Sequence, residues 1–385
     1  MGVVNRAIAL LVSQSDHMNE VLSGAMVSFI VRLLGAVSQF GVTILIVRMY
    51  GADGYGIYAL ALSLVVISAT IGRWGLDQSV LKFISLHAEN EGLNSVKDIF
   101  VKALLVVITL SGIISLMLYL LAPWLSEAVF EEPVLIVLIQ LMAMSIIPLS
   151  LLTLISESLR AMKKMAEHTV VQVLLLPLIS IMLLFQFKAM GMDLRAAAYA
   201  FVFASIVSVG IAFQLWYRTV GSLRHNKSED IAVSLRKLIT TANPMAWVLI
   251  VSVIMSFAET LILGLFFSSK EVGVYAASLR LALIVNFFIV AFNSILAPKF
   301  AVLYHQNNFS QVQEMIKSSV IAMLLLTSPI FIAFFLFPEY VLSVFGAEFS
   351  HEPEVLMILA LGQLVNIFSG PLGMMLLMIL RFQKY

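Results

Sequence analysis

The stretch Gly56-Ile-Tyr-Ala59 opens an apolar run that closes at Lys82-Phe83, and the chain contains this pattern a second time. In the second copy, Gly273-Val-Tyr-Ala276 opens the run and Lys299-Phe300 closes it. The two glycines, the two tyrosines, the two lysines and the two phenylalanines are each separated by 217 residues. Four matches at one separation over a helix-length segment indicate a tandem duplication, so we expect two similar lobes in the fold.

The residue composition indicates a chain that lies in a membrane. Of the 385 residues, 61% are hydrophobic and only 12% are charged, and the mean hydropathy is +1.03. Soluble domains carry about a quarter of charged residues, roughly twice this share. Apolar windows of about 20 residues recur along the chain, and each is long enough to cross a hydrocarbon layer of ~30 Å. The sequence therefore predicts an all-α integral membrane protein.

Several kinds of function find no support in the residues. There is no cysteine, and the six histidines form no pair at i, i+4 spacing, so no metal site is expected. The sequence has no phosphate-binding loop, no zinc-protease helix and no nucleophile elbow. The net charge of +1 gives no signal for a nucleic-acid partner. We therefore expect no catalytic residue, no metal and no cofactor, and a protein that is not an enzyme.

About ten transmembrane spans can be drawn from the hydropathy pattern. They run approximately over residues 24–47, 57–79, 100–121, 134–155, 169–187, 196–217, 245–267, 274–297, 318–338 and 355–379. This division predicts an N-terminal segment over 1–23, an N-lobe of six helices over 24–217, a linker over 218–244 and a C-lobe of four helices over 245–385. Most of the 23 Lys and Arg residues fall on the side of the N-terminus, which predicts a cytoplasmic N-terminus and a cytoplasmic linker.

The two lobes are expected to be parallel repeats, because each begins on the same side of the membrane. A loop pattern repeats as well, as Leu121-Ala-Pro-Trp124 and again as Leu336-Phe-Pro-Glu339. The second copy stops where the first still has two helices to come. We therefore expect a chain that is truncated at its C-terminus, with about twelve spans in the complete protein.

Charged side chains inside the predicted spans are the first candidates for a functional site, because a charge in hydrocarbon costs a few kcal/mol. Arg32 lies in the first span, and Arg73 and Asp77 lie in the second, spaced i, i+4 on one predicted helix face. The functional interpretation is a cationic pocket of Arg32 and Arg73 for an anionic head group, with Asp77 as an ion-coupling carboxylate. The structural alternative is that Arg73 pairs with Asp77 while Arg32 reaches the membrane surface.

The second lobe offers a comparable set. Glu259 on the seventh span and Arg280 on the eighth lie at similar predicted depth. They either neutralise each other as an ion pair, or Arg280 contacts substrate while Glu259 takes up a proton or a sodium ion. Amides also lie in pairs on single helix faces, Asn286 with Asn293 and Gln363 with Asn366. Such amides either hydrogen-bond between helices or contact the substrate, and Asn286 and Asn293 are our candidates for substrate contact.

The order of these motifs resembles that of Wzx-type polysaccharide flippases, in the multidrug/oligosaccharidyl-lipid/polysaccharide exporter superfamily. The resemblance covers roughly residues 20–384, and it rests on four stretches: Tyr50-Gly-Ala-Asp-Gly-Tyr-Gly-Ile-Tyr-Ala59 after an arginine-containing first span, Gly273-Val-Tyr-Ala276, Ala297-Pro-Lys-Phe300 and Ser369-Gly-Pro-Leu-Gly373. It implies two lobes of six helices each, around a central cavity that works by alternating access. In that family the cavity tends to be cationic, and Arg32, Arg73 and Arg280 are the positions that match such a role.

The function that the resemblance implies is the flipping of oligosaccharides linked to polyprenyl pyrophosphate across the bacterial inner (plasma) membrane, as in O-antigen and lipopolysaccharide synthesis. The implied partners are this lipid-linked oligosaccharide, membrane lipids, and the polysaccharide polymerase and glycosyltransferases of the same pathway. Two alternatives stay open. One is a cation-coupled multidrug exporter of the same superfamily, for which carboxylates inside the membrane would be expected. The other is a non-transporting membrane component of a polysaccharide assembly complex.

Overall fold

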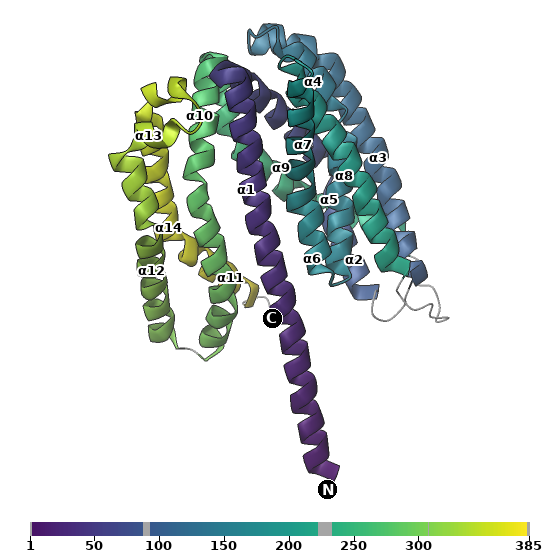
Figure 1. Ribbon diagram of the computed structural model, residues 1–385. Coiled ribbons are helices and arrows are strands. Elements are labelled where there is room, and N and C mark those ends of the chain that lie inside the picture. Colours follow the sequence, from purple (N-terminus) through teal and green to yellow (C-terminus); the bar gives the residue numbers. More distant parts are fainter. Residues whose placement is uncertain (1, 88–92, 222–232, 307, 383–385) are drawn as a thin grey trace. The chain divides into compact units, whose positions relative to one another are not determined.

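The structure, a computed structural model, describes residues 2–87, 93–221, 233–306 and 308–382. All the regular secondary structure of these residues is helical (Figure 1). By their contacts the residues form two compact units, the first of Met1–Tyr50 with Ile57–Ser269 and the second of Gly51–Gly56 with Lys270–Tyr385. Each unit is described by itself below.

The helices of the first unit follow the predicted spans closely. They are α1 (Gly2–Arg73), α2 (Leu76–His87), α3 (Leu93–Trp124), η1 (Leu125–Val129), α4 (Leu135–Ala143), α5 (Ile146–Ala161), α6 (Met165–Thr169), η2 (Val170–Leu174), α7 (Leu175–Ala189), α8 (Arg195–Gly221) and α9 (Leu235–Phe266). α1 contains two of the predicted spans, because Gly51 has φ 72° and ψ −174° and divides it into two helices. Its apolar part, Val27–Arg73, has 47 residues, or about 70 Å at 1.5 Å per residue, more than twice the thickness of the hydrocarbon layer.

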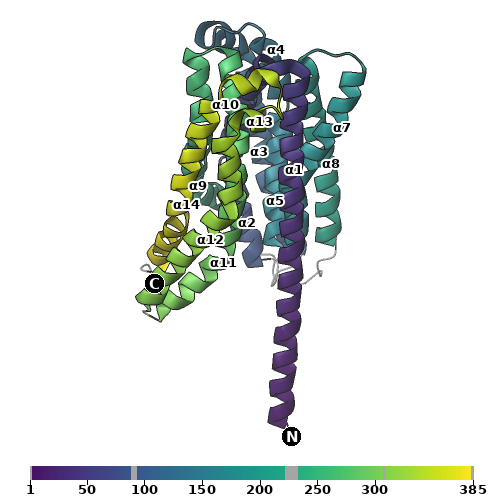
Figure 2. The ribbon, with the colours of Figure 1, turned by 60° about the vertical axis from the view of Figure 1, so that its left-hand side comes forward.

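The second unit has α10 (Ser269–Ala282), α11 (Ile284–His305), α12 (Phe309–Leu336), α13 (Pro338–Leu342), η3 (Ala347–His351) and α14 (Pro353–Phe382). In Figure 2 the three long helices α11, α12 and α14 lie side by side, and each of them packs against the other two. An interhelical hydrogen bond joins two of them, since Asn366 Nδ2 of α14 donates to Asn286 Oδ1 of α11 at 2.9 Å.

The prediction of an all-α membrane fold is confirmed. Over the described residues, seven helices are long and apolar enough to cross a membrane, and an eighth results when α4 and α5, bent by 44° at their break, are taken as one span. Each of the ten predicted spans falls mainly on helical residues, with internal interruptions at 74–75, 144–145 and 283. The side of the membrane on which the N-terminus lies stays a prediction.

The core of the first unit lies between α2, α3, α5 and α8, which are neighbours in Figure 1. Phe100 of α3 is fully buried there and stacks on Trp216 of α8 at 4.1 Å between ring centres. The Trp216 indole N–H also donates to Ser158 Oγ of α5 at 2.9 Å, so the indole N–H has a hydrogen-bond partner inside the core. Small residues elsewhere allow close helix contacts, as expected for helices in lipid: a Cβ on Gly35 of α1 would lie 2.5 Å from the Val173 side chain.

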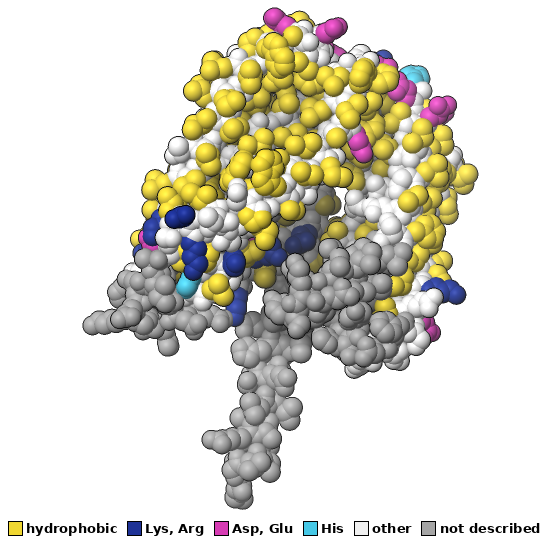
Figure 3. Space-filling view, turned by 180° about the vertical axis from the view of Figure 1, so that it is seen from behind, with side chains coloured by type: hydrophobic (Ala, Val, Ile, Leu, Met, Phe, Trp, Pro, Cys, Tyr) yellow, Lys and Arg dark blue, Asp and Glu magenta, His cyan; other side chains and the backbone are white. Residues whose placement is uncertain are grey.

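The outer surface of the first unit is apolar where lipid is expected and charged at its ends (Figure 3). Leu105 and Leu120 of α3 are 61% and 66% exposed, which suits contact with lipid rather than with water. Lys97 stands in the first turns of α3, whereas the exposed Glu127 follows its last residue. The basic Lys97 and the acidic Glu127 therefore lie at opposite ends of this part of the chain, while Asp98, at the same end as Lys97, pairs with Lys102 at 2.6 Å.

The contacts place α9 with the first unit, although the predicted C-lobe begins at residue 245. The reason is its packing on α2: Ser79 Oγ of α2 donates to the Leu238 carbonyl of α9 at 3.0 Å, and Leu238 is fully buried. The predicted lobe boundary stays a prediction, because repeat boundaries and contact boundaries need not coincide. Residues 222–232 of the predicted linker lie outside the described residues.

Candidate functional site

The second predicted span is interrupted in the middle of its charged residues. α1 ends at Arg73, the next two residues have φ values of 47° (Trp74) and 69° (Gly75), and α2 begins at Leu76. The expectation of one continuous helix over 57–79, with Arg73 and Asp77 one turn apart on a single face, is therefore wrong. Two consecutive residues in the left-handed region end a right-handed helix.

Packing against α9 explains why the helix breaks at this point. A Cβ on Gly75 would lie 2.7 Å from both the Ala242 carbonyl oxygen and the Ala246 nitrogen, so only glycine lets the two backbones approach. The Trp74 indole N–H donates to Asn243 Oδ1 at 3.1 Å. The Trp74 ring also meets the Trp247 ring edge to face at 5.8 Å. The break is thus fixed by a helix more than 160 residues away in sequence.

The break places two charges at helix ends that favour them. Arg73 stands in the last turn of α1 and Asp77 in the first turn of α2. The C-terminal carbonyls of a helix favour a cation and the N-terminal amides favour an anion. The interruption therefore lowers the free-energy cost of placing the Arg73 and Asp77 charges inside an apolar segment of the chain.

Arg73 is held by hydroxyl groups rather than by a carboxylate. Its Nη2 donates to Thr70 Oγ1 at 3.0 Å and its Nη1 to Thr153 Oγ1 of α5 at 3.3 Å. Its Nε is buried and has no hydrogen-bond partner in the part of the chain that the structure describes. Asp77 and Glu157 act on the guanidinium electrostatically, without an ion pair within 4 Å among the described residues. The guanidinium therefore keeps donors that are not taken up by an acid.

The two carboxylates nearby are both buried. Asp77 is 3% exposed; its Oδ2 accepts from the Gln78 side chain at 3.3 Å, and its Oδ1 has no partner within the described residues. Glu157 of α5 is 7% exposed and accepts from Arg160 Nη1 at 3.3 Å. Arg73, Asp77, Thr153 and Glu157 together are called the α1–α2 polar cluster from here on.

Sequence reasoning missed Glu157 and the buried His168. Both lie at the end of α5 or just after it, where charged residues are ordinary, so their positions carried no signal of burial. His168 Nδ1 lies 2.8 Å from Ser156 Oγ and 3.0 Å from the Ser156 carbonyl oxygen. The spacing of Glu157 from Thr153, one helical turn, is the signal that would have indicated a shared polar face on α5.

Arg32, the other arginine predicted for the first lobe, is exposed on the first half of α1. Its neighbours Ile30 and Leu33 are exposed as well, at 49% and 43%. Within the described residues it takes part in no ion pair, unlike Arg160 and Arg195. The structure does not bring Arg32 to the α1–α2 polar cluster, and its role stays a prediction.

The second unit has a milder interruption, because Leu283 keeps the helical bond to the Leu279 carbonyl at 2.9 Å and Ser269–Asn293 forms one span of 25 residues. The eighth predicted span divides at Leu283 into α10 and α11, and the half-buried Arg280 stands in the last turn of α10. Glu259 lies on α9 in the first unit and is exposed, so its pairing with Arg280 stays a prediction.

The predicted amide pairs take different positions. Asn286 at the start of α11 and Asn366 of α14 bond to each other, as expected for amides that join helices, and Asn366 also donates to Gln363 Oε1 at 3.3 Å. Asn293 of α11 does not join this group; its Oδ1 is buried and has no partner among the residues described. Whether Asn286 and Asn293 contact substrate stays a prediction.

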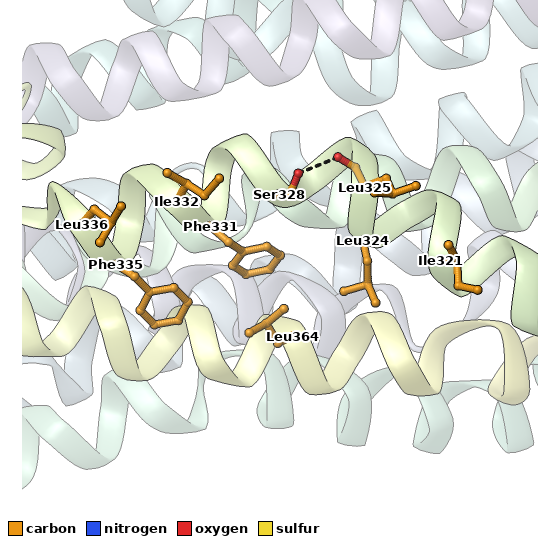
Figure 4. A pocket seen from close by; sticks show the side chains of 9 residues that line it. All are labelled: Ile321, Leu324, Leu325, Ser328, Phe331, Ile332, Phe335, Leu336 and Leu364. Atoms are coloured by element: carbon orange, nitrogen blue, oxygen red, sulfur yellow. Dashed lines mark hydrogen bonds between the residues drawn. The ribbon is translucent and has the colours of Figure 1, made fainter.

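An apolar groove of about 570 Å³ lies between α12 and α14 (Figure 4). Phe331, Phe335 and Leu364 line it, and its one polar side chain, Ser328, donates its hydroxyl to the Leu325 carbonyl at 2.7 Å. Such a lining suits hydrocarbon and offers nothing to a charged head group. The described residues also contain no group of three or more His, Asp and Glu side chains that would hold a metal ion.

Comparisons with known proteins agree with this architecture. Residues 21–304 match the family described as "Polysaccharide biosynthesis protein", and residues 244–379 match the MatE family. A protein of Haloferax volcanii described as a probable low-salt glycan biosynthesis flippase is 30% identical over 106 residues, which are 27% of this chain and 22% of that protein. The chain thus aligns with about a fifth of that relative's length.

Solved structures share the fold. The MATE multidrug transporter DinF-BH, in complex with R6G, matches with a TM-score of 0.62 and 16% identity over 94% of each chain. A MOP superfamily transporter from Pyrococcus furiosus, with a binding pocket described as having reverse polarity, matches with a TM-score of 0.59 and 13% identity over 92% of this chain and 84% of that one. At such identities the likeness shows the fold alone.

Proposed function

Because the chain belongs to the polysaccharide biosynthesis protein family, we propose that it flips polyprenyl-pyrophosphate-linked oligosaccharides across the bacterial inner (plasma) membrane. The chain is a multi-pass membrane protein of a transporter family. To this membership of a transporter family, the proposal adds a substrate, a particular membrane and a direction of transport, from the inner to the outer leaflet. It also places the N-terminus in the cytoplasm, together with the basic ends of the helices.

The observation that carries the proposal is the way Arg73 is held. A pyrophosphate head group needs fixed positive charge, since its passage through hydrocarbon is prohibitive. An arginine neutralised by a carboxylate at close range would not serve, whereas Arg73 is oriented by two threonine hydroxyls and keeps unused donors. Its planar fork matches a phosphate better than an ammonium group does.

Arg280 stands in the last turn of α10, one turn before the interruption at Leu283. We propose that Arg73, Arg280 and the exposed Arg32 contact the pyrophosphate at successive stages of an alternating-access cycle. Asn286 and Asn293 would contact sugar hydroxyls, and the buried Asp77 together with the exposed Glu259 would couple transport to an ion. The polymerase and the glycosyltransferases of the same pathway are the proposed partners.

The test compares cells that lack this gene with the same cells after a copy of the gene has been restored. Lipid-linked oligosaccharide on the cytoplasmic leaflet is measured. We expect it to accumulate without the gene and to fall when the wild-type chain is expressed. Arg73→Lys should reduce flipping at least ~10-fold, since about 1.4 kcal/mol, the order of one charge-assisted hydrogen bond, corresponds to tenfold. Arg195→Lys is the matched control, because Arg195 is exposed and bonded to Asp193.

Two results would contradict the proposal. One is the absence of any accumulation in cells without the gene, and the other is full flipping by Arg73→Lys at wild-type protein levels. The first result would favour the second candidate, a cation-coupled multidrug exporter, which the match to the MatE family and the likeness to MATE structures support. Efflux of an organic cation from the same cells, measured in parallel, separates the two functions.

A further inference from the structure

Two tryptophans from different helices meet at the break that follows Arg73. Trp74 lies in the break between α1 and α2, and Trp247 lies on α9. The centres of the two rings are 5.8 Å apart and their planes are inclined by 67°, which is an edge-to-face contact. In such a contact the edge of one ring covers at most one face of the other, so both rings keep a face that the partner leaves open. Trp247 is 58% exposed, and Trp74 is half-buried.

Trp74 holds a strained backbone conformation. Its φ of 47° lies in the left-handed region, where a bulky side chain is a rare exception. Residues held in such conformations cluster at ligand sites, where the surrounding structure keeps them in place. The close packing of α2 on α9 is provided by the neighbouring Gly75, where an added Cβ would clash with α9. Packing alone therefore does not require an indole at position 74.

An exposed amide stands beside the two rings. Asn243 lies one helical turn before Trp247 on the same face of α9. Its Oδ1 accepts the Trp74 indole N–H at 3.1 Å, and this bond decides which end of the amide faces the indole. The Nδ2 group therefore points away from the indole and has no acceptor within the described part of the chain. Pro244 has no N–H, so the Thr240 carbonyl lacks its helical donor and supplies an acceptor on the preceding turn.

The depth of Trp247 distinguishes it from tryptophans that anchor a protein at the lipid head groups. The exposed Lys237 in the first turn of α9 lies ten residues earlier, or ~15 Å along the helix at 1.5 Å per residue. The head-group region of one leaflet is only ~5–8 Å thick, and anchoring tryptophans lie within it. With Lys237 at the membrane surface, Trp247 therefore lies deeper than a head-group anchor.

We propose that Trp74, Asn243 and Trp247, called the indole corner from here on, bind the pyranose ring that is joined to the pyrophosphate of the substrate. The inference rests on the proposed function for the identity of the lipid, and it adds the sugar site. One face of a pyranose carries C–H groups, whose partial positive charge is attracted by the negative face of an indole. The hydroxyl groups point outward from the ring edge, where the Asn243 amide donates to them and the Thr240 carbonyl accepts from them.

The position of the indole corner matches the covalent order of the substrate. In the lipid, the first sugar is bonded directly to the pyrophosphate. In the chain, Trp74 directly follows Arg73, and consecutive Cα atoms are ~3.8 Å apart. A phosphate held by Arg73 therefore leaves the first sugar within reach of Trp74 and Trp247. The rings provide contact area and orientation, whereas Arg73 provides the charge.

Equilibrium binding to the purified full chain in lipid nanodiscs tests the indole corner. The two probes are a radiolabelled polyprenyl pyrophosphate that carries one pyranose and the same lipid without the sugar. The readout is the ratio of their dissociation constants, in which effects on the phosphate cancel. We expect the wild-type chain to bind the glycosylated lipid at least ~10-fold more tightly, and Trp247→Leu to reduce this preference about tenfold. Trp247→Tyr should retain most of the preference, because a phenol ring still offers an aromatic face.

Trp124→Leu is the matched control. Trp124 is 60% exposed, against 58% for Trp247, and it ends α3. The control should bind both lipids as the wild type does. Equal loss of preference in the two leucine variants would overturn the proposal in favour of a general role of exposed tryptophans in the membrane. A wild-type ratio near one, or an equal loss of both lipids in Trp247→Leu, would overturn it as well, while the phosphate site of the proposed function would stand.

Asn243→Asp tests the polar side of the indole corner. The carboxylate still accepts the Trp74 indole N–H, but it has no donor for a sugar hydroxyl. We expect a smaller preference for the glycosylated lipid, whatever the added charge does to the affinity for pyrophosphate. An unchanged preference would contradict the assignment of the amide.

A probe without phosphate separates this inference from the proposed function. If the wild-type chain binds neither lipid, the proposed substrate is wrong, and the indole corner is judged by titration with methyl glucopyranoside. A saturable change in tryptophan fluorescence is expected for the wild type and for Trp124→Leu, and none for Trp247→Leu. A change in all three proteins, or in none of them, would refute the indole corner.

Discussion

Gly75 is the residue on which the break between α1 and α2 most depends, and replacing it by alanine separates two physical effects. The first is backbone strain, since φ is 69° and an L-residue in the left-handed region costs roughly 1–2 kcal/mol. The second is the clash of the new Cβ with α9, at 2.7 Å from two backbone atoms that cannot turn away. Overpacking of this kind costs about 1–3 kcal/mol. We therefore expect Gly75→Ala to lower the free energy of unfolding by about 2–5 kcal/mol.

Two other glycines of the first unit provide the comparison. Gly191 also has a positive φ, 73°, but nothing lies within 4 Å of its Cβ, so Gly191→Ala should show the strain alone, roughly 1–2 kcal/mol. Gly210 lies in the interior of α8 with open space around it, and Gly210→Ala should be neutral or stabilise by up to about 1 kcal/mol.

The three variants are purified in the same detergent, and their unfolding is followed by circular dichroism during denaturant titration. Hydrogen exchange along Leu235–Ala246 shows whether α9 has detached from α2. The expected order of stability is Gly210→Ala, then Gly191→Ala, then Gly75→Ala, with faster exchange in α9 only for the last. If Gly75→Ala were as stable as Gly191→Ala, the backbone contact with α9 would not be what sets the break.

Three further predictions concern individual polar groups. Asn286→Leu and Asn366→Leu should show a coupling energy of about 0.6 kcal/mol in a double-mutant cycle of unfolding, because they share one interhelical bond within the membrane; strict additivity would contradict a shared bond. Asp77→Asn, which keeps the shape but removes the charge, should make flipping in vesicles insensitive to an imposed ion gradient, and an unchanged gradient dependence would remove Asp77 from coupling. Arg280→Lys should lower flipping about tenfold at normal expression, because the charge persists at the helix end while the planar fork is lost; wild-type flipping would show that the fork does not matter.

Features that depend on local composition were predictable from the sequence. The apolar windows identified every helix of span length, because a segment in hydrocarbon must satisfy its own backbone hydrogen bonds and has few alternatives to a helix. The duplication identified Gly56 and Gly273 as equivalent, and their identity as glycine is explained by the close backbone contact in which Gly273 takes part. Asn286 and Asn366 bond across two helices, as amides inside a membrane tend to do.

Features that depend on distant packing were not predictable. The break after Arg73 requires α9 to lie against Gly75, and nothing in the residues around 73–77 indicates that neighbour. The burial of Glu157 depends on how α5 packs against α2, so its place near the end of a predicted span was uninformative. Glu348 lies in η3, in a segment rich in acidic residues, and only the three-dimensional structure shows that it accepts from the Ala52 N–H.

The helix break after Arg73 and the one-residue interruption at Leu283 are not copies of each other. Leu283 does not lie 217 residues after Trp74, so the duplication did not carry one break into both repeats. Arg73 stands in the last helical turn before two left-handed residues, where the free carbonyls of the helix favour a cation. An arginine in the middle of an unbroken apolar helix would have no such compensation and would cost several kcal/mol more. The break after Arg73 therefore compensates a cation in the first repeat, whereas Arg280 of the second repeat lies within a nearly continuous span.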